Sequence, residues 1–162
     1  MFQKSGNLRY LYLVALALLV YVLGAFVTSP AVQVYAVKLQ SANLSDGSIS
    51  LILNLFTLII IIISTTLMAW IYMLIYNRIY SKDKLTFMLS VEASMIAQLP
   101  TFIIELAMNN MNHGIVYPLI GSIVCVITYV AFIAYIKKLT FKQDIILTVL
   151  FLLVGILLQI LI

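Results

Sequence analysis

Charged residues are scarce in this chain. They make up 9% of its 162 residues, whereas apolar residues make up 65%. An ordinary globular domain has about 25% charged and about 45–50% apolar residues. A chain this short has too little interior to hide so much apolar surface from water. The composition therefore excludes a soluble globular protein and predicts an integral membrane protein.

Cysteine and histidine occur once each, as Cys125 and His113. A single cysteine excludes an intramolecular disulfide and a thiolate metal cluster, and its apolar surroundings predict a packed core residue. Neither a glycine-rich phosphate loop nor a Ser-His-Asp set can be assembled, and Glu105 with His113 offers too few ligands for zinc. The basic residues are not gathered on one soluble face. We therefore predict a protein that is not an enzyme, has no cofactor and binds no nucleic acid.

Long apolar runs dominate what is present. A helix needs about 20 mostly apolar residues to span a bilayer, and five such segments can be drawn. The sequence predicts one all-α membrane domain over residues 1–162, a polytopic bundle of about five transmembrane helices at residues 10–29, 49–76, 85–108, 115–136 and 145–162. The first run is too long for a secretory signal and is predicted to be a retained helix.

The basic residues set the expected orientation. Eight of the nine fall before the first helix, between the second and third, and between the fourth and fifth. Cytoplasmic segments carry such an excess, so the N-terminus is expected in the cytoplasm and the C-terminus outside. The frequent use of Ile, Leu and Lys indicates a bacterial cytoplasmic membrane. Residues 30–48 are expected to form an outer connection. Its first part either continues the first helix past a kink at Pro30 or lies on the membrane surface.

The tetrapeptide KLTF occurs twice, at 84–87 and 138–141, each time before an apolar run. Thr86 and Thr140 stand where a helix N-cap is expected. Anionic lipid headgroups are the expected partners of the neighbouring cations, each worth about 1 kcal/mol near the surface. These cations are Arg78, Lys82, Lys84, Lys137, Lys138 and Lys142. We interpret the repeat chiefly as two separate helix starts that have the same local requirements. A function shared by the two copies is the alternative.

Polar side chains interrupt the third apolar segment. Ser90, Ser94 and Gln98 follow one another at steps of four, which places them on one face of a helix. They form either a polar track for a proton or solute, or hydrogen bonds between packed helices. Pro100 should kink the helix and free the carbonyl of Ile96. The candidate functional residues in the membrane are Glu92, Ser94, Gln98, Pro100 and Glu105.

Two carboxylates lie in this segment. Glu92 is about two turns from its cytoplasmic end, so it is expected to face other helices, water or the inner headgroups. Glu105 is roughly 20 Å further along at 1.5 Å per residue, so the two cannot form one catalytic dyad within the helix. Glu105 is expected near the outer interface, in contact with solvent. In the second helix, the hydroxyls at 64–66 are expected to bond back to the preceding turn.

The stretch LTFMLSVEASMIAQLPTFI resembles the core of Yip1-like membrane domains. The matching features are Thr86-Phe87, Ala93-Ser94 and Leu99-Pro100, followed by the helix GIVYPLIGSIVCVITYVAFIAYIKKLTF. The resemblance covers about residues 50 to 162 and is to a small, bacterial-type member. It implies a non-enzymatic helix bundle that acts through partner proteins.

Three functions remain open from the sequence. The leading expectation is a subunit, scaffold or regulator of a membrane transport, export or trafficking complex, which binds other membrane proteins or itself. The second is a small transporter or channel with a proton or solute path through Glu92, Gln98 and Pro100. The third is a self-protection protein against a membrane-active peptide.

Overall fold

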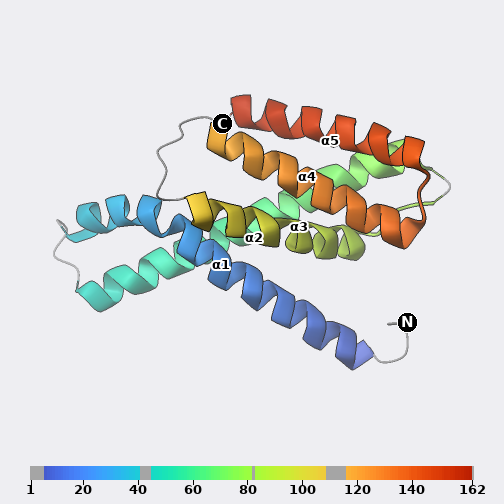
Figure 1. Ribbon diagram of the computed structural model, residues 1–162. Helices are drawn as coiled ribbons and strands as arrows, with labels where there is room; N and C mark the ends of the chain where they lie inside the picture. Colours follow the sequence, from blue (N-terminus) through green and yellow to red (C-terminus); the bar gives the residue numbers. More distant parts are fainter. Residues whose placement is uncertain (1–5, 41–44, 82, 109–115, 162) are drawn as a thin grey trace. The chain divides into compact units, whose positions relative to one another are not determined.

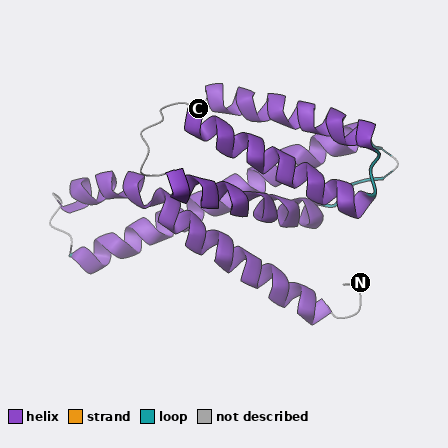
Figure 2. Cartoon of the chain, viewed as in Figure 1, coloured by secondary structure: helices purple, strands orange, loops and turns teal. Residues whose placement is uncertain are grey.

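The computed structural model describes residues 6–40, 45–81, 83–108 and 116–161, and all of its regular structure there is helical (Figure 1). The helices are α1 (Gly6–Gln40), α2 (Asp46–Ile79), α3 (Phe87–Met108), α4 (Val116–Lys137) and α5 (Phe141–Leu161). Figure 2 shows the same helices and, within the described part, only short loops between them. The all-α prediction is confirmed.

Four segments are long and apolar enough to cross a membrane. They are Leu8–Val27, Asp46–Ile79, Phe87–Ala107 and Leu119–Lys137. This finding supports an integral membrane protein. The fifth crossing at α5, the orientation and the single-domain reading stay predictions.

The first helix is longer than expected. It runs through Pro30 to Gln40, so most of the expected outer connection 30–48 is helical. Proline removes one backbone donor and crowds the carbonyl four residues before it. No glycine follows until Gly47, and residues such as Ala31, Gln33 and Ala36 favour a helix. The alternative in which the first helix continues past Pro30 is therefore the one observed.

The second helix also begins earlier than expected, at Asp46 rather than at residue 49. The Ser45 hydroxyl accepts a hydrogen bond from the backbone N–H of Ser48 at 3.3 Å. This is the bond of a serine N-cap, and Asp46 adds a negative charge in the first turn, where the helix dipole favours it. The last residues of the connection expected over 30–48 therefore start the helix.

The chain divides into two compact units, Met1–Ser64 and Thr65–Ile162, called here the N-terminal and C-terminal units. In the N-terminal unit, the described part consists of α1 and the first half of α2. The buried hydrophobic side chains of α1 are three or four residues apart, at Leu13, Leu16 and Val20. Such spacing marks one buried stripe on a helix whose other faces are apolar but exposed, as expected for contact with lipid.

The C-terminal unit holds the rest of α2 together with α3, α4 and α5. Within this unit α4 packs against both α3 and α5 (Figure 1). The buried cluster draws on all four helices and on the loop before α3, and its members are Tyr72, Tyr76, Leu85, Ala93, Ala97, Cys125, Val126, Tyr129, Val130, Ile133, Leu147 and Phe151. Cys125 is buried in this cluster, as the sequence predicts.

Three aromatic rings lie at the centre of the cluster. The ring of Tyr72 stacks on that of Phe151 with centroids 4.3 Å apart, and Tyr129 meets both rings edge-on. In the sequence, Tyr72 and Tyr76 lie at the inner end of the second expected helix, which predicts them at the headgroup level, where tyrosines are enriched. They are buried instead, because their face of α2 is the one that packs within the C-terminal unit.

Candidate functional site

The polar side chains of α3 lie on one buried face of the C-terminal unit. Ser90 and Ser94 are 0% exposed, and Gln98 is 8% exposed. The step of four residues therefore marked a real stripe. The surrounding core positions Ala93 and Ala97 are small, which lets the neighbouring helices approach this stripe closely.

Ser90 joins three helices. Its hydroxyl donates to the backbone carbonyl of Ala69 in α2 at 2.6 Å and lies 2.6 Å from the hydroxyl of Tyr129 in α4. Because the single Ser90 proton is used on Ala69, Tyr129 must be the donor in the second bond. Ser90 thus satisfies a buried phenol and ties α2, α3 and α4 together.

Gln98 forms a two-way pair with Thr65 of α2. The Gln98 amide nitrogen donates to the Thr65 hydroxyl at 2.9 Å, and that hydroxyl donates back to the Gln98 amide oxygen at 3.1 Å. From the sequence, either Gln98 or a neighbouring helix could supply a partner for the Ile96 carbonyl that Pro100 frees. The Gln98 side chain is committed to Thr65 instead. Of the hydroxyls at 64–66, Ser64 does bond back, to the carbonyl of Ile61, whereas Thr65 bonds to α3.

A double-mutant cycle on this pair is expected to show coupling. The substitutions Thr65→Val and Gln98→Leu should each lower the free energy of unfolding, since each leaves a buried polar partner unsatisfied. The coupling energy should be about 0.6 kcal/mol, the average between membrane helices, and at most about 1.7 kcal/mol. Unfolding by denaturing detergent in mixed micelles measures it, with Thr66→Val on the exposed face of α2 as the control. Strictly additive effects would contradict the pair.

Two more of the predicted residues are Ser94, which belongs to this stripe, and Pro100. The Ser94 hydroxyl is buried, and no hydrogen-bond partner for it is seen among the described residues. Pro100 lies inside α3, half-buried, and the helix continues past it to Met108. The single hydroxyl proton of the following Thr101 is shared between the carbonyls of Ala97 and of Gly121 in α4, at 3.2 and 3.3 Å. Thr101 therefore links α3 to α4 one residue after the proline.

The two carboxylates of α3 are both half-buried. Glu105 lies against α4, because a Cβ added to Gly121 would be 3.3 Å from its Oε1 atom, and its expected place near the outer interface stays a prediction. Among the residues that the structure describes, no three His, Cys, Asp or Glu side chains come together as metal ligands. The Glu105–His113 pair lies outside this test, because His113 is not among the described residues.

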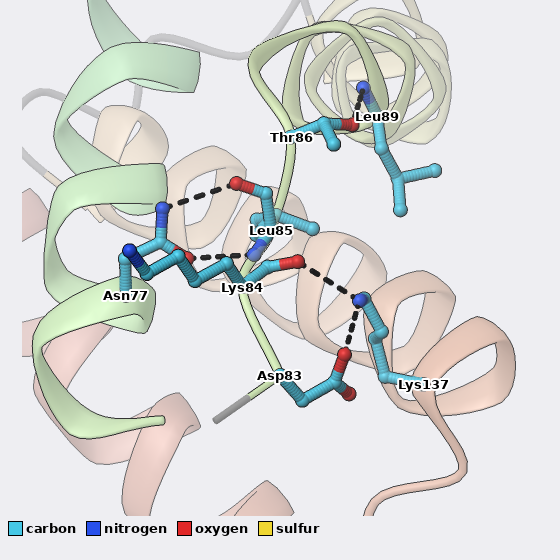
Figure 3. A network of polar contacts seen from close by, with 7 residues as sticks. All are labelled: Asn77, Asp83, Lys84, Leu85, Thr86, Leu89 and Lys137. Carbon is cyan, nitrogen blue, oxygen red and sulfur yellow. Dashed lines mark hydrogen bonds and ion pairs between the residues drawn. The ribbon is translucent and has the colours of Figure 1, made fainter. Parts of the chain in front are cut away.

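The first KLTF copy is held by a polar network at the start of α3 (Figure 3). The Asn77 side chain pairs with the backbone of Leu85 in both directions, accepting from its N–H at 2.6 Å and donating to its carbonyl at 3.0 Å. Thr86 accepts from the N–H of Leu89 at 3.4 Å, the N-cap role predicted for it. Asn77 was missed from the sequence, because its partner is a backbone segment whose position depends on the turn.

Lys137, which precedes the second KLTF copy, reaches the first one. Its ammonium group forms an ion pair with Asp83 at 2.6 Å and donates to the carbonyl of Lys84 at 3.0 Å (Figure 3). Lys137 was grouped with the cations expected to meet headgroups. The structure commits it to the α2–α3 loop, so the two copies meet in space at one end of the C-terminal unit.

The second KLTF copy is fixed differently. Lys138 has a positive φ of 51°, and the N–H of Leu139 bonds to the carbonyl of Ala134 at 3.2 Å, the pattern of a Schellman helix end. Gln143 then accepts from the backbone N–H of Thr140 at 2.8 Å and from its hydroxyl at 3.0 Å. Thr140 lies at the predicted cap position, but Gln143 supplies the bond to the backbone, as in one half of a capping box.

No family model matches the chain, and neither a curated protein nor a solved structure is found to match it. The resemblance to Yip1-like membrane domains therefore stays a prediction, and the functional argument rests on the geometry given above.

Proposed function

We propose that this chain is a non-enzymatic, multi-pass membrane protein that acts as a subunit, scaffold or regulator of a membrane transport, export or trafficking complex. It resides in the bacterial cytoplasmic membrane with its N-terminus in the cytoplasm. The Yip1-like resemblance of residues 50–162 points to the same role. The observation that carries the proposal is the reciprocal Thr65–Gln98 pair.

In this pair, the polar groups of Thr65 and Gln98 bond to each other, so they are not available to line a transport path. A path for a proton or solute requires polar side chains that face water. Gln98 instead bonds to Thr65 of α2, Ser90 bonds to α2 and α4, and both side chains are buried. Each bond joins two helices, so the polar stripe fixes helix packing. A firmly packed bundle suits a protein that presents a constant surface to its partners.

Cross-linking in native membranes tests this function. The tagged chain is cross-linked before extraction in mild detergent, and the cross-linked sites are mapped by mass spectrometry. We expect one membrane protein, at near-equimolar amount, on the same exposed positions of the wild type, Glu92→Gln and Ser94→Ala. Liposomes that contain the purified chain should show no more proton flux than liposomes without protein.

The opposite outcome has a defined form. The chain would purify alone as a defined oligomer, and its liposomes would carry a flux that Glu92→Gln abolishes. Ser90→Ala is the matched control for Ser94→Ala. Ser90 lies on the same stripe as Ser94, but its hydroxyl is already bonded to two partners.

A small transporter or channel is the second candidate, and one observation favours it. The hydroxyls of Ser94 and Tyr76 are buried, with no hydrogen-bond partner in the described part of the chain. An unsatisfied buried polar group costs about 1–3 kcal/mol and calls for an explanation, such as a bound water or a passing solute. The flux assay with Ser94→Ala decides between this candidate and a merely structural hydroxyl.

A further inference from the structure

The turn between α4 and α5 carries two unusually exposed rings. Tyr135 is 85% exposed and Phe141 is 78% exposed, the two largest values among the exposed large hydrophobic side chains of the described residues. Lys138 and Lys142 are exposed beside them. Two rings and two lysines thus lie within eight residues, at the end of the C-terminal unit where the two KLTF copies meet. We call these four side chains the aromatic-lysine turn.

The backbone of this turn is firmly held. The left-handed Lys138 and the bond from Leu139 to Ala134 end α4, and Gln143 fixes the first residues of α5. Leu139 packs against the buried cluster, which anchors the turn from inside. The aromatic-lysine turn is therefore pre-organised, and a ligand that binds it pays little to order the backbone.

The charge around the turn is positive. The described residues at this end of the unit include five cations, Arg78, Lys84, Lys137, Lys138 and Lys142, and two acids, Asp83 and Asp144, a net formal charge of +3. Asp83 pairs with Lys137, and one carboxylate oxygen of Asp144 is buried with no hydrogen-bond partner in the described part of the chain. Within the described part, no hydrogen bond or ion pair of the Lys138 or Lys142 side chain is seen.

We propose that the aromatic-lysine turn binds the phosphate headgroup of an anionic phospholipid. Lys138 and Lys142 contact the phosphate, while Tyr135 and Phe141 lie at the boundary between headgroups and acyl chains, where aromatic rings are enriched. A second copy of the chain is disfavoured as the occupant because it would bring like charges together. The turn is thus a lipid-selective contact, separate from the polar stripe and independent of the proposed function.

Native mass spectrometry of the purified chain in mild detergent tests the proposal. Phosphatidylglycerol and phosphatidylcholine are added in equal amounts, and the bound fractions are compared. We expect phosphatidylglycerol to bind preferentially to the wild type. In the double variant Lys138→Gln/Lys142→Gln its affinity should fall about thirty-fold, from about 1 kcal/mol for each lysine and a factor of ten per about 1.4 kcal/mol. The affinity for phosphatidylcholine should not change.

Lys137→Gln is the matched control, because Lys137 is adjacent in sequence but committed to Asp83 and Lys84. This variant should lower the unfolding temperature by the same few degrees with either lipid and leave the preference for phosphatidylglycerol intact. Equal binding of both lipids to the wild type would overturn the proposal, as would an unchanged affinity in the double variant. Displacement of the lipid by soluble glycerol phosphate would also overturn it, since the turn would then be a phosphate site that needs no membrane.

Discussion

Replacing Phe151 by alanine should lower the free energy of unfolding by about 3 kcal/mol, the low end of the range for truncating a buried phenylalanine. Phe151 is 1% exposed, and its ring stacks on Tyr72 at an interplanar angle of 9°. It also meets Tyr129 at a centroid distance of 5.6 Å. One side chain of α5 therefore packs against rings of both α2 and α4. The low end applies because lipid offers apolar contact to separated helices, so the loss is mainly one of packing.

Unfolding in mixed micelles with increasing denaturing detergent measures this loss. Leu153→Ala is the matched control, since Leu153 lies two residues further along α5 and is exposed. Its effect should stay within about 0.5 kcal/mol. Equal losses for Phe151→Ala and Leu153→Ala would show that the three rings do not form the centre of the bundle.

The helices themselves could be predicted from the length of the apolar runs. The fourth was expected at 115–136 and is Val116–Lys137, because glycine and charged residues limit the run at both ends. The first was expected at 10–29, with continuation past Pro30 as one of two alternatives, and it continues to Gln40. Proline weakens a helix without always ending it, and a polar segment of good helix formers gives little warning of which will happen. The count of crossings and their orientation rest on composition alone and stay predictions.

The polar stripe of α3 could be predicted in part. A step of four residues placed Ser90, Ser94 and Gln98 on one face before any partner was known. Their partners could not be predicted, because Thr65 and Tyr129 lie 33 and 39 residues away from the residues they bond. Such pairs depend on how the helices rotate against each other. The rotation of α2 about its axis could not be predicted either, and this explains the error at Tyr72 and Tyr76.

The sequence of the second helix does not reveal how that helix is rotated about its axis. It is apolar on all sides, so no contrast between faces reveals which side packs against protein and which meets lipid. Tyrosines near its expected end were therefore assigned to the interface, where exposed tyrosines are enriched. In the structure Tyr76 and Tyr72 point into the core, while Trp70 and Leu74 on other faces are exposed. The Asn77 clamp on Leu85 was missed for a related reason, since its partner is a backbone segment.

Valine in place of Gly121 should lower the free energy of unfolding by about 2–3 kcal/mol, because it overfills a tight contact. A Cβ at this position would lie 3.2 Å from Cγ2 of Thr101 and 3.3 Å from Oε1 of Glu105. Valine adds two methyl groups beyond that Cβ, so α3 and α4 must move apart. That movement would also stretch the bond from Thr101 to the Gly121 carbonyl, which is already 3.3 Å long. The same micelle titration measures the loss.

Gly155→Val is the control that isolates the close approach. Gly155 lies inside α5, and a Cβ added there would meet nothing within 4 Å. Both variants replace glycine by valine in a helix interior. The change in helix propensity is therefore the same in both and cancels when their losses of stability are compared. The loss at Gly121 should therefore exceed that at Gly155 by about 2 kcal/mol. Equal effects would mean that α3 and α4 do not touch at this glycine. They would also contradict the placement of Glu105 against α4.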